Sequence, residues 1–108
     1  MILATSELAP GREITEILGI VMGNSVRARH IGRDITAAFK NIVGGEIREY
    51  SVLQAESREQ ATRRMVERAE QLGADAIIGI RYSTSMIASG ASEILAYGTA
   101  VKLSTPGA

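Results

Sequence analysis

The stretch Ala76–Leu103 decides the fold, and it reads AIIGIRYSTSMIASGASEILAYGTAVKL. It begins with a continuous apolar run and then alternates between apolar and polar residues, which is typical of a strand over residues 76–86. Small and polar residues at 88–92 indicate a turn, and strand composition returns over residues 93–103. Two such strands joined by a short Gly/Ser loop predict an antiparallel hairpin.

A long helix is expected before this hairpin, from about Val52 to Leu72, with Gly73 as its C-cap. Apolar residues recur at helical spacing along it: Leu53, Ala61, Met65, Ala69 and Leu72. The opposite side carries charges, namely Glu59, Arg63, Arg64, Glu67 and Arg68. We expect these charges to form a solvated face, since such runs usually lie exposed.

The chain before this helix predicts one more helix and two strands. Residues 31–43 place their apolar side chains on one helical face, and Gly44-Gly45 then ends the helix. Residues 2–6 are typical of a short strand, and residues 13–26 of a long one that is bent or bulged near Gly19 and Gly23, where a missing side chain lets the backbone kink or another chain approach. We expect these first two strands to pair as antiparallel neighbours.

The predicted architecture is therefore an α+β fold in the order β-β-α-α-β-β. Both helices are expected on one face of an antiparallel sheet, because each element must bury one apolar side. Residues 1–103 make a single domain, and residues 104–108, which include Pro106-Gly107, are expected to be a disordered tail.

Composition narrows the classes of function. Twelve basic residues balance twelve acidic ones in the 108-residue chain, which disfavours a nucleic-acid-binding module. The longest apolar stretch, residues 17–23, is far below the ~20 residues that a membrane-spanning helix needs. The N-terminus lacks the features of a signal peptide, and we expect a cytoplasmic protein that contacts neither membrane nor nucleic acid.

The core is expected to be thin. Aromatic residues make up 4% of the chain, and with no cysteine there is no disulfide to compensate. A subunit interface is the remaining common way to cover apolar surface, which favours a homo-oligomer.

Three strings resemble the YbjQ family of small, mostly bacterial proteins: residues 42–46 (IVGGE), 72–76 (LGADA) and 96–101 (AYGTAV). Gly23-Asn24 and Arg33-Asp34 add to the likeness, which spans about residues 1–103. The resemblance implies a dodecin-like subunit that forms a homopentameric ring. It also implies the family's label of heavy-metal binding, but no catalytic residue and no cofactor.

A divalent metal is one candidate ligand. His30 is the single histidine, and Asp34 lies one helical turn away, so both side chains can reach one ion if the helix begins that early. Two ligands do not make a tight site, although a ring of subunits gathers several copies around its axis. The alternative is that His30 is a surface or helix-start residue. The absence of thiols weakens the heavy-metal label for this chain.

A small anion is the second candidate ligand. Arg27, Arg29 and Arg33, together with His30, form the densest basic cluster, just before or at a predicted helix N-terminus. The free N–H groups there favour a phosphate or a carboxylate. The alternative is that these arginines pair with acidic residues of this chain or of a neighbouring subunit.

Catalysis has little support in the sequence. Glu46, Glu49 and Tyr50 are expected in the loop between the helices, where capping and subunit contact are the simpler roles. Gly79 and Gly98 lie inside predicted strands, which indicates close approach of backbone, an aromatic side chain or a ligand. We expect a protein without enzymatic activity, most simply a homopentameric binding or scaffold protein. The alternative is a metal- or small-anion-binding protein with its site at a subunit interface or on the symmetry axis.

Overall fold

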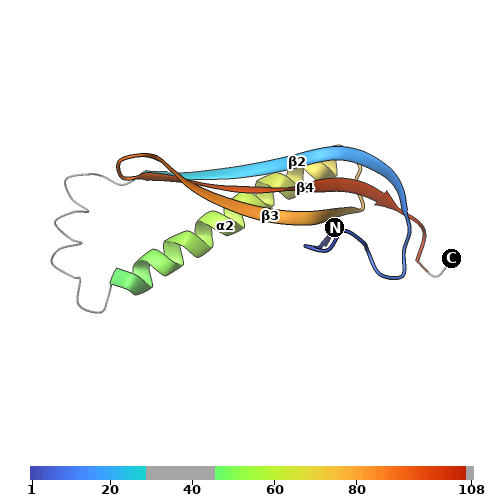
Figure 1. Cartoon of the computed structure of the whole chain (residues 1–108), viewed down its shortest axis with the longest axis horizontal. Coiled ribbons are helices and arrows are strands. Elements are labelled where there is room, and N and C mark those ends of the chain that lie inside the picture. The colour runs from blue at the N-terminus through green and yellow to red at the C-terminus, as the bar shows by residue number, and fades with distance from the viewer. Residues whose placement is uncertain (29–45, 107–108) are drawn as a thin grey trace.

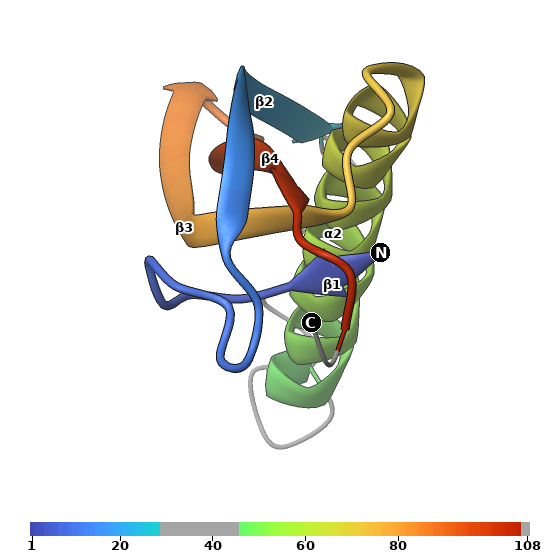
Figure 2. The same ribbon diagram turned by 90° about the vertical axis from the view of Figure 1, so that its right-hand side faces the viewer.

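The computed structural model describes residues 1–28 and 46–106, with the side chains of residues 1–27 and 54–106. Its elements, in chain order, are β1 (Ile2–Leu3), β2 (Ile14–Ala28), α2 (Glu46–Gln71), β3 (Ala76–Ala88) and β4 (Ala91–Leu103). The three long strands run side by side, and α2 crosses behind them at an angle (Figure 1). Seen from the end, α2 lies on one side of a curved sheet (Figure 2). The α+β class is confirmed, and the helix predicted over residues 31–43 lies outside the described residues.

The sheet is mixed, with the strand order β1-β3-β4-β2. The prediction that the first two strands pair with each other is wrong, because β1 instead runs parallel to β3, with Ile2 opposite Ala76. The chain after β1 continues alongside β3, where the amide of Ile80 donates to the Ala4 carbonyl at 3.1 Å. Meanwhile β2 pairs with β4 over nearly its whole length. That long antiparallel ladder outweighs the few hydrogen bonds a two-residue strand offers.

The hairpin predicted over residues 76–103 is confirmed, with antiparallel β3 and β4 joined at Ser89-Gly90. Gly90 has a φ of 76°, as tight turns require. The bend predicted in β2 lies at register shifts between Ile14 and Glu16 and between Ile17 and Gly19.

The helix α2 begins at Glu46, earlier than the predicted residue 52. Glu46, Glu49 and Tyr50 therefore belong to the helix and not to a loop, which corrects the sequence-based assignment. The prediction started from the apolar residues that begin at Leu53 and overlooked Ile47 and Tyr50, which continue the helical spacing toward the N-terminus. The Glu and Arg residues of these turns also have high helix propensity.

Small residues let α2 approach the sheet closely. A Cβ built on Gly23 of β2 would collide with the helix backbone at Ala61 and Met65. These two helix residues, Ala69 and the facing Ala96 of β4 are completely buried. Gly23 therefore permits contact between helix and strand. The bend predicted near Gly19 is confirmed and the one predicted near Gly23 is wrong, because the register of β2 against β4 is regular there.

A second apolar cluster lies on the other face of the sheet, at the end near both termini. It comprises Ala9, Ala76, Ile78, Val101 and Leu103, with Ile14 packed against it. Ser104, assigned from the sequence to a disordered tail, is instead anchored here. Its amide donates to the Glu13 carbonyl at 2.7 Å, and its own carbonyl accepts from Arg12 Nε at 2.8 Å.

The two strand glycines serve different purposes. At Gly98 an added Cβ would lie 2.7 Å from Ile77 Cγ2 and 3.0 Å from the Ile78 carbonyl oxygen, so the expected close approach is confirmed. At Gly79 nothing lies within 4 Å, but φ is +61°, which side chains other than glycine adopt at a cost. The register of β3 against β4 shifts between Ile78 and Arg81, so Gly79 marks a bulge.

Candidate interaction surfaces

One face of the sheet is open along most of β2. Side chains alternate between the faces of a strand, and Val21, Gly23 and Ser25 face α2. The residues that alternate with them, which include Ile20, Met22 and Val26, must therefore point away from the helix. Together with Ile17 and with Tyr97, which lies opposite Met22, these three form an exposed apolar surface that we call the sheet-face patch.

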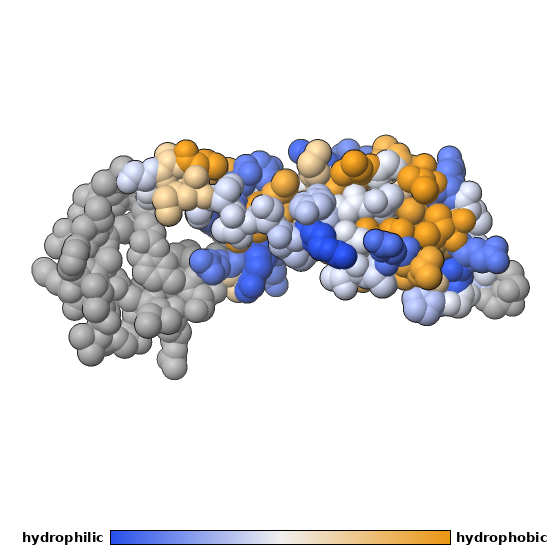
Figure 3. Space-filling model, in the orientation of Figure 1, coloured by the Kyte–Doolittle hydropathy of each residue, from blue (hydrophilic) through white to orange (hydrophobic). Residues whose placement is uncertain are grey.

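The sheet-face patch is unusually exposed for its composition. Ile20 is 73% exposed and Ile17 is 70% exposed, while Met22, Val26 and Tyr97 are more than one third exposed. The space-filling view from the open side of the sheet shows apolar residues on this face, gathered mainly toward the end near the termini (Figure 3). Exposed apolar side chains gathered on one face are typical of an interaction site.

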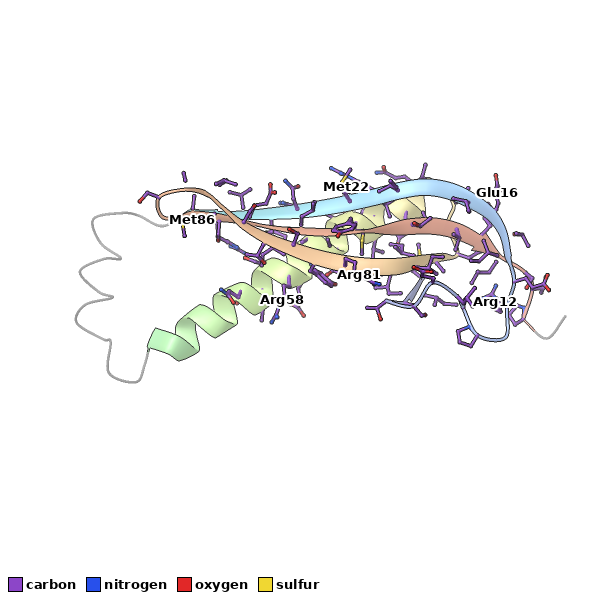
Figure 4. All side chains as sticks on the ribbon, viewed as in Figure 1. Arg12, Glu16, Met22, Arg58, Arg81 and Met86 are labelled. Atoms are coloured by element: carbon purple, nitrogen blue, oxygen red, sulfur yellow. The ribbon has the colours of Figure 1, made fainter. Side chains whose placement is uncertain are left out.

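A second exposed apolar site lies at the far end of the sheet. Met86 is 80% exposed and Ile87 is 54% exposed, both close to the β3–β4 turn. Figure 4 shows Met22 on β2 and Met86 near this turn, well separated along the sheet. The chain thus carries two distinct apolar surfaces, the sheet-face patch and this hairpin end (Met86 and Ile87).

Two arginines of α2 cap the outer edge of β2. Arg64 donates to the Asn24 carbonyl at 2.6 Å, and Arg68 donates to the Met22 carbonyl at 2.8 Å. The predicted solvated face is confirmed, since both side chains are exposed along with Glu59, Arg63 and Glu67. Sequence reasoning missed the carbonyl bonds, because nothing in a helical charge pattern shows which strand lies beside it.

An open groove lies between α2 and β3, lined by Ala55, Arg58, Glu59, Thr62, Arg63 and Tyr82. The hydroxyls of Thr62 and Tyr82 are 2.8 Å apart, and Thr62 Oγ1 donates to the Arg58 carbonyl at 2.7 Å. Tyr82 must therefore donate to Thr62, because the hydroxyl hydrogen of Thr62 is already engaged. The pair fastens β3 to the helix.

The candidate anion site is described only in part. Arg27 lies near the end of β2, where its Nε donates to Ser57 Oγ on α2 at 3.0 Å. This agrees with a pairing role within the chain, although the partner is a hydroxyl and not a carboxylate. Arg29 and Arg33, the other two members, lie outside the described residues.

The metal candidates His30 and Asp34 also lie outside the described residues. Within the part of the chain that the structure describes, no three His, Cys, Asp or Glu side chains gather as a metal site would need. The whole sequence offers no thiolate and one imidazole, whereas heavy metals prefer these soft donors. The described residues therefore do not fit a heavy-metal ion.

Over residues 1–28 and 46–106, no helix is both long and apolar enough to cross a bilayer.

Comparison with known proteins identifies relatives over almost the whole chain. A UPF0145 protein from Vibrio campbellii is 60% identical over 103 residues, covering 95% of this chain and 99% of its own. A UPF0145 protein from Thermotoga maritima is 59% identical, covering 95% of this chain and 97% of its own. One from Archaeoglobus fulgidus is 53% identical and covers 95% of each chain.

A solved structure supports the fold. It is a protein of unknown function from Pediococcus pentosaceus, assigned to the DUF74 family, with a TM-score of 0.65. Its sequence is 18% identical, and the match covers 96% of this chain and 98% of the other. The model of the YbjQ family, described as "Putative heavy-metal-binding", matches residues 1–104. The resemblance seen in the sequence is thereby confirmed, and the chain belongs to the YbjQ family.

Proposed function

We propose that this protein is a non-enzymatic binding or scaffold protein that works as a homo-oligomeric ring, with five copies as the expected number. The sheet-face patch is the observation that carries the proposal. An isolated chain would leave this apolar surface in water. A second copy of the same chain is a partner that is present wherever the protein is made. We also propose that it works in the cytoplasm, as its composition suggests.

A ring is favoured over a simple dimer because the two exposed apolar surfaces are different and lie apart. Ile20 belongs to the sheet-face patch, and Met86 to the hairpin end. When one surface of a copy contacts a different surface of the next, the contacts repeat head to tail, and they close into a ring when the rotation between copies is a whole fraction of a turn. The number five comes from the family resemblance and is the part of the proposal that a mass measurement decides.

The test is the mass in solution, by sedimentation or native mass spectrometry at micromolar concentration. We expect five times the 11.5 kDa of the chain. A double variant, Ile17→Ser with Ile20→Ser, should reduce the assembled mass. Leu8→Ser is the matched control, because Leu8 is 71% exposed but lies outside the sheet-face patch. A wild-type monomer at this concentration would refute the proposal.

Metal binding is the second candidate, favoured by the description of the family model. Because the described residues do not fit such a site, any ligands would have to include His30 and Asp34, repeated around a ring. Elemental analysis of the purified protein, followed by titration with zinc, is the measurement. Binding that His30→Ala abolishes supports this function, and unchanged affinity in that variant rejects the named residues.

A further inference from the structure

The two outer edges of the sheet, on β2 and on β3, differ in what covers their backbone groups. On β2, Arg64 and Arg68 occupy the carbonyls of Asn24 and Met22, and two register shifts bend the first half of the strand. On β3, the neighbouring N-terminal segment stops at Ile80, whose amide donates to Ala4. From residue 82 to residue 88, β3 has no further strand on its outer side within the described residues.

The backbone groups that face outward can be assigned from these bonds. A strand residue directs its N–H and C=O to the same side, and successive residues alternate. Met22 accepts from Arg68, so it faces away from β4, and its partner Tyr97 must face β3. Tyr97 is opposite Arg81, so Arg81 faces inward and Tyr82 faces outward.

Alternation along β3 then gives three outward residues, Tyr82, Thr84 and Met86, while Ser83 and Ser85 bond to β4. Natural proteins protect such an edge with charges, proline or a covering segment. Residues 82–88, YSTSMIA, contain no charge and no proline, and their side chains are exposed. This edge is therefore ready to pair with another strand.

We propose that the outer edge of β3 at Tyr82, Thr84 and Met86 pairs with the first half of β2 (residues 14–21) of a second copy. The sheet then continues from one subunit into the next. This inference rests on the proposed homo-oligomer and names the seam that joins its members. The seam is a head-to-tail contact, because it uses two different edges of the chain.

The first half of β2 is the complementary edge for two reasons, and its two register shifts leave Ile17 and Ile20 directed outward. Its outward groups include those of Ile17 and Ile20, because their partners Val101 and Thr99 face β3, and within the described residues the capping arginines reach only Met22 and Asn24. Pairing also places the exposed side chains of Ile17 and Ile20 beside a neighbouring strand, which shields part of the sheet-face patch.

The orientation of the seam follows from the topology. Both β2 and β3 are antiparallel to β4, so they run in the same direction. Copies in a ring are related by rotation about one axis, so the seam between β3 and the next β2 is parallel. The register shifts in β2 bend the strand, as closure of a sheet into a ring requires.

The direct test is amide hydrogen exchange of the wild-type oligomer, followed residue by residue by NMR or by fragmentation mass spectrometry. The amides of Tyr82, Thr84 and Met86, and those of Ile17 and Ile20, should exchange at least about 100-fold more slowly than unprotected amides. Fast exchange of either set in an assembled sample overturns the seam. Fast exchange is also the result expected if the edge of β3 pairs with a strand of a different protein that is absent from the sample.

A proline pair provides the second test. Thr84→Pro removes an outward N–H that bonds to nothing in the described part of the chain, so the fold should remain and the assembled mass should fall. Ser83→Pro removes a ladder bond to β4 and should instead lower the melting temperature strongly. If Thr84→Pro assembles like the wild type, the proposed seam is wrong but the proposed homo-oligomer is not. If the wild type is a monomer, both proposals are wrong.

If Thr84→Pro does not fold, Thr84→Lys takes its place, since a lysine on an edge opposes pairing without removing any N–H. It should lower the assembled mass, while Gln71→Lys, a charge at an exposed position near the end of α2, should not. Equal masses for the two lysine variants would overturn the seam.

Discussion

The two faces of the sheet use their residues in opposite ways. The face beneath α2 combines buried large residues with small ones, and Gly23 and Ala96 let the helix backbone come close. Along β2 the open face carries large residues such as Ile20 and Met22, which remain exposed. The difference shows that close packing against α2 stabilises the single chain at one face, while the apolar side chains of β2 on the other face contribute little to it.

The largest expected effect on stability comes from replacing a methionine by alanine beneath α2, and the same replacement on the open face provides the comparison. Met65 is completely buried beneath the sheet, and Met65→Ala should lower the free energy of unfolding by about 2–5 kcal/mol. Met22 is 44% exposed on the open face, and Met22→Ala should change it by less than about 0.5 kcal/mol.

Urea denaturation measures the free energy of unfolding of both methionine variants. Low protein concentration is needed, because assembly would itself stabilise the folded chain. Similar losses for the two variants would contradict the contrast between the faces.

Gly23→Ala tests the closeness of the helix. The added methyl group meets the backbone of Ala61 and Met65, which cannot rotate away as a side chain does. We expect a loss of about 3 kcal/mol, at the upper end for overpacking. Thermal and urea unfolding give the value. A loss below about 1 kcal/mol would mean that α2 lies farther from β2 than described.

Gly79→Ala should have a smaller effect, because space is not the constraint there. The cost is the positive φ of 61°, which amounts to about 1–2 kcal/mol for a residue with a Cβ. Asn tolerates this conformation better, so Gly79→Asn should recover part of the loss. Equal stability of the wild type and both variants would show that the bulge can relax.

Arg68→Met should have the smallest effect on the fold. It removes one exposed hydrogen bond to the Met22 carbonyl and keeps most of the aliphatic length. We expect a loss of about 0.5–1 kcal/mol, measured by thermal unfolding. Arg63→Met is the control on the same helix, since Arg63 lines the groove and bonds to no strand carbonyl among the described residues. A larger loss for the control would contradict the capping role.

Local pattern was sufficient for some elements and insufficient for others. The β3–β4 hairpin and the body of α2 were predictable, because alternation and helical periodicity are both properties of neighbouring residues. The place of β1 was not, since its two residues pair with β3 more than 70 positions later in the chain. The start of α2 at Glu46 was missed because Ile47 and Tyr50 were not counted with the helical apolar residues that begin at Leu53.

The candidate site shows the same limit more sharply. Residues 17–22 of β2, ILGIVM, are apolar almost without interruption, so the sequence does not say which of them face the core. The residues chosen from charge and metal chemistry were Arg27, which bonds to Ser57, and others outside the described residues. The exposed apolar surface and the open edge were found only with the strands in place.

The sequence by itself determined the α+β class, the hairpin, the family and an expectation of assembly, because composition and short-range periodicity encode these. The tertiary structure decided which face of β2 is covered, which edge is capped by arginine and which edge is open. Those properties depend on where α2 lies against the sheet. Its position follows from the absence of a side chain at Gly23, whose role appears only when helix and strand are brought together.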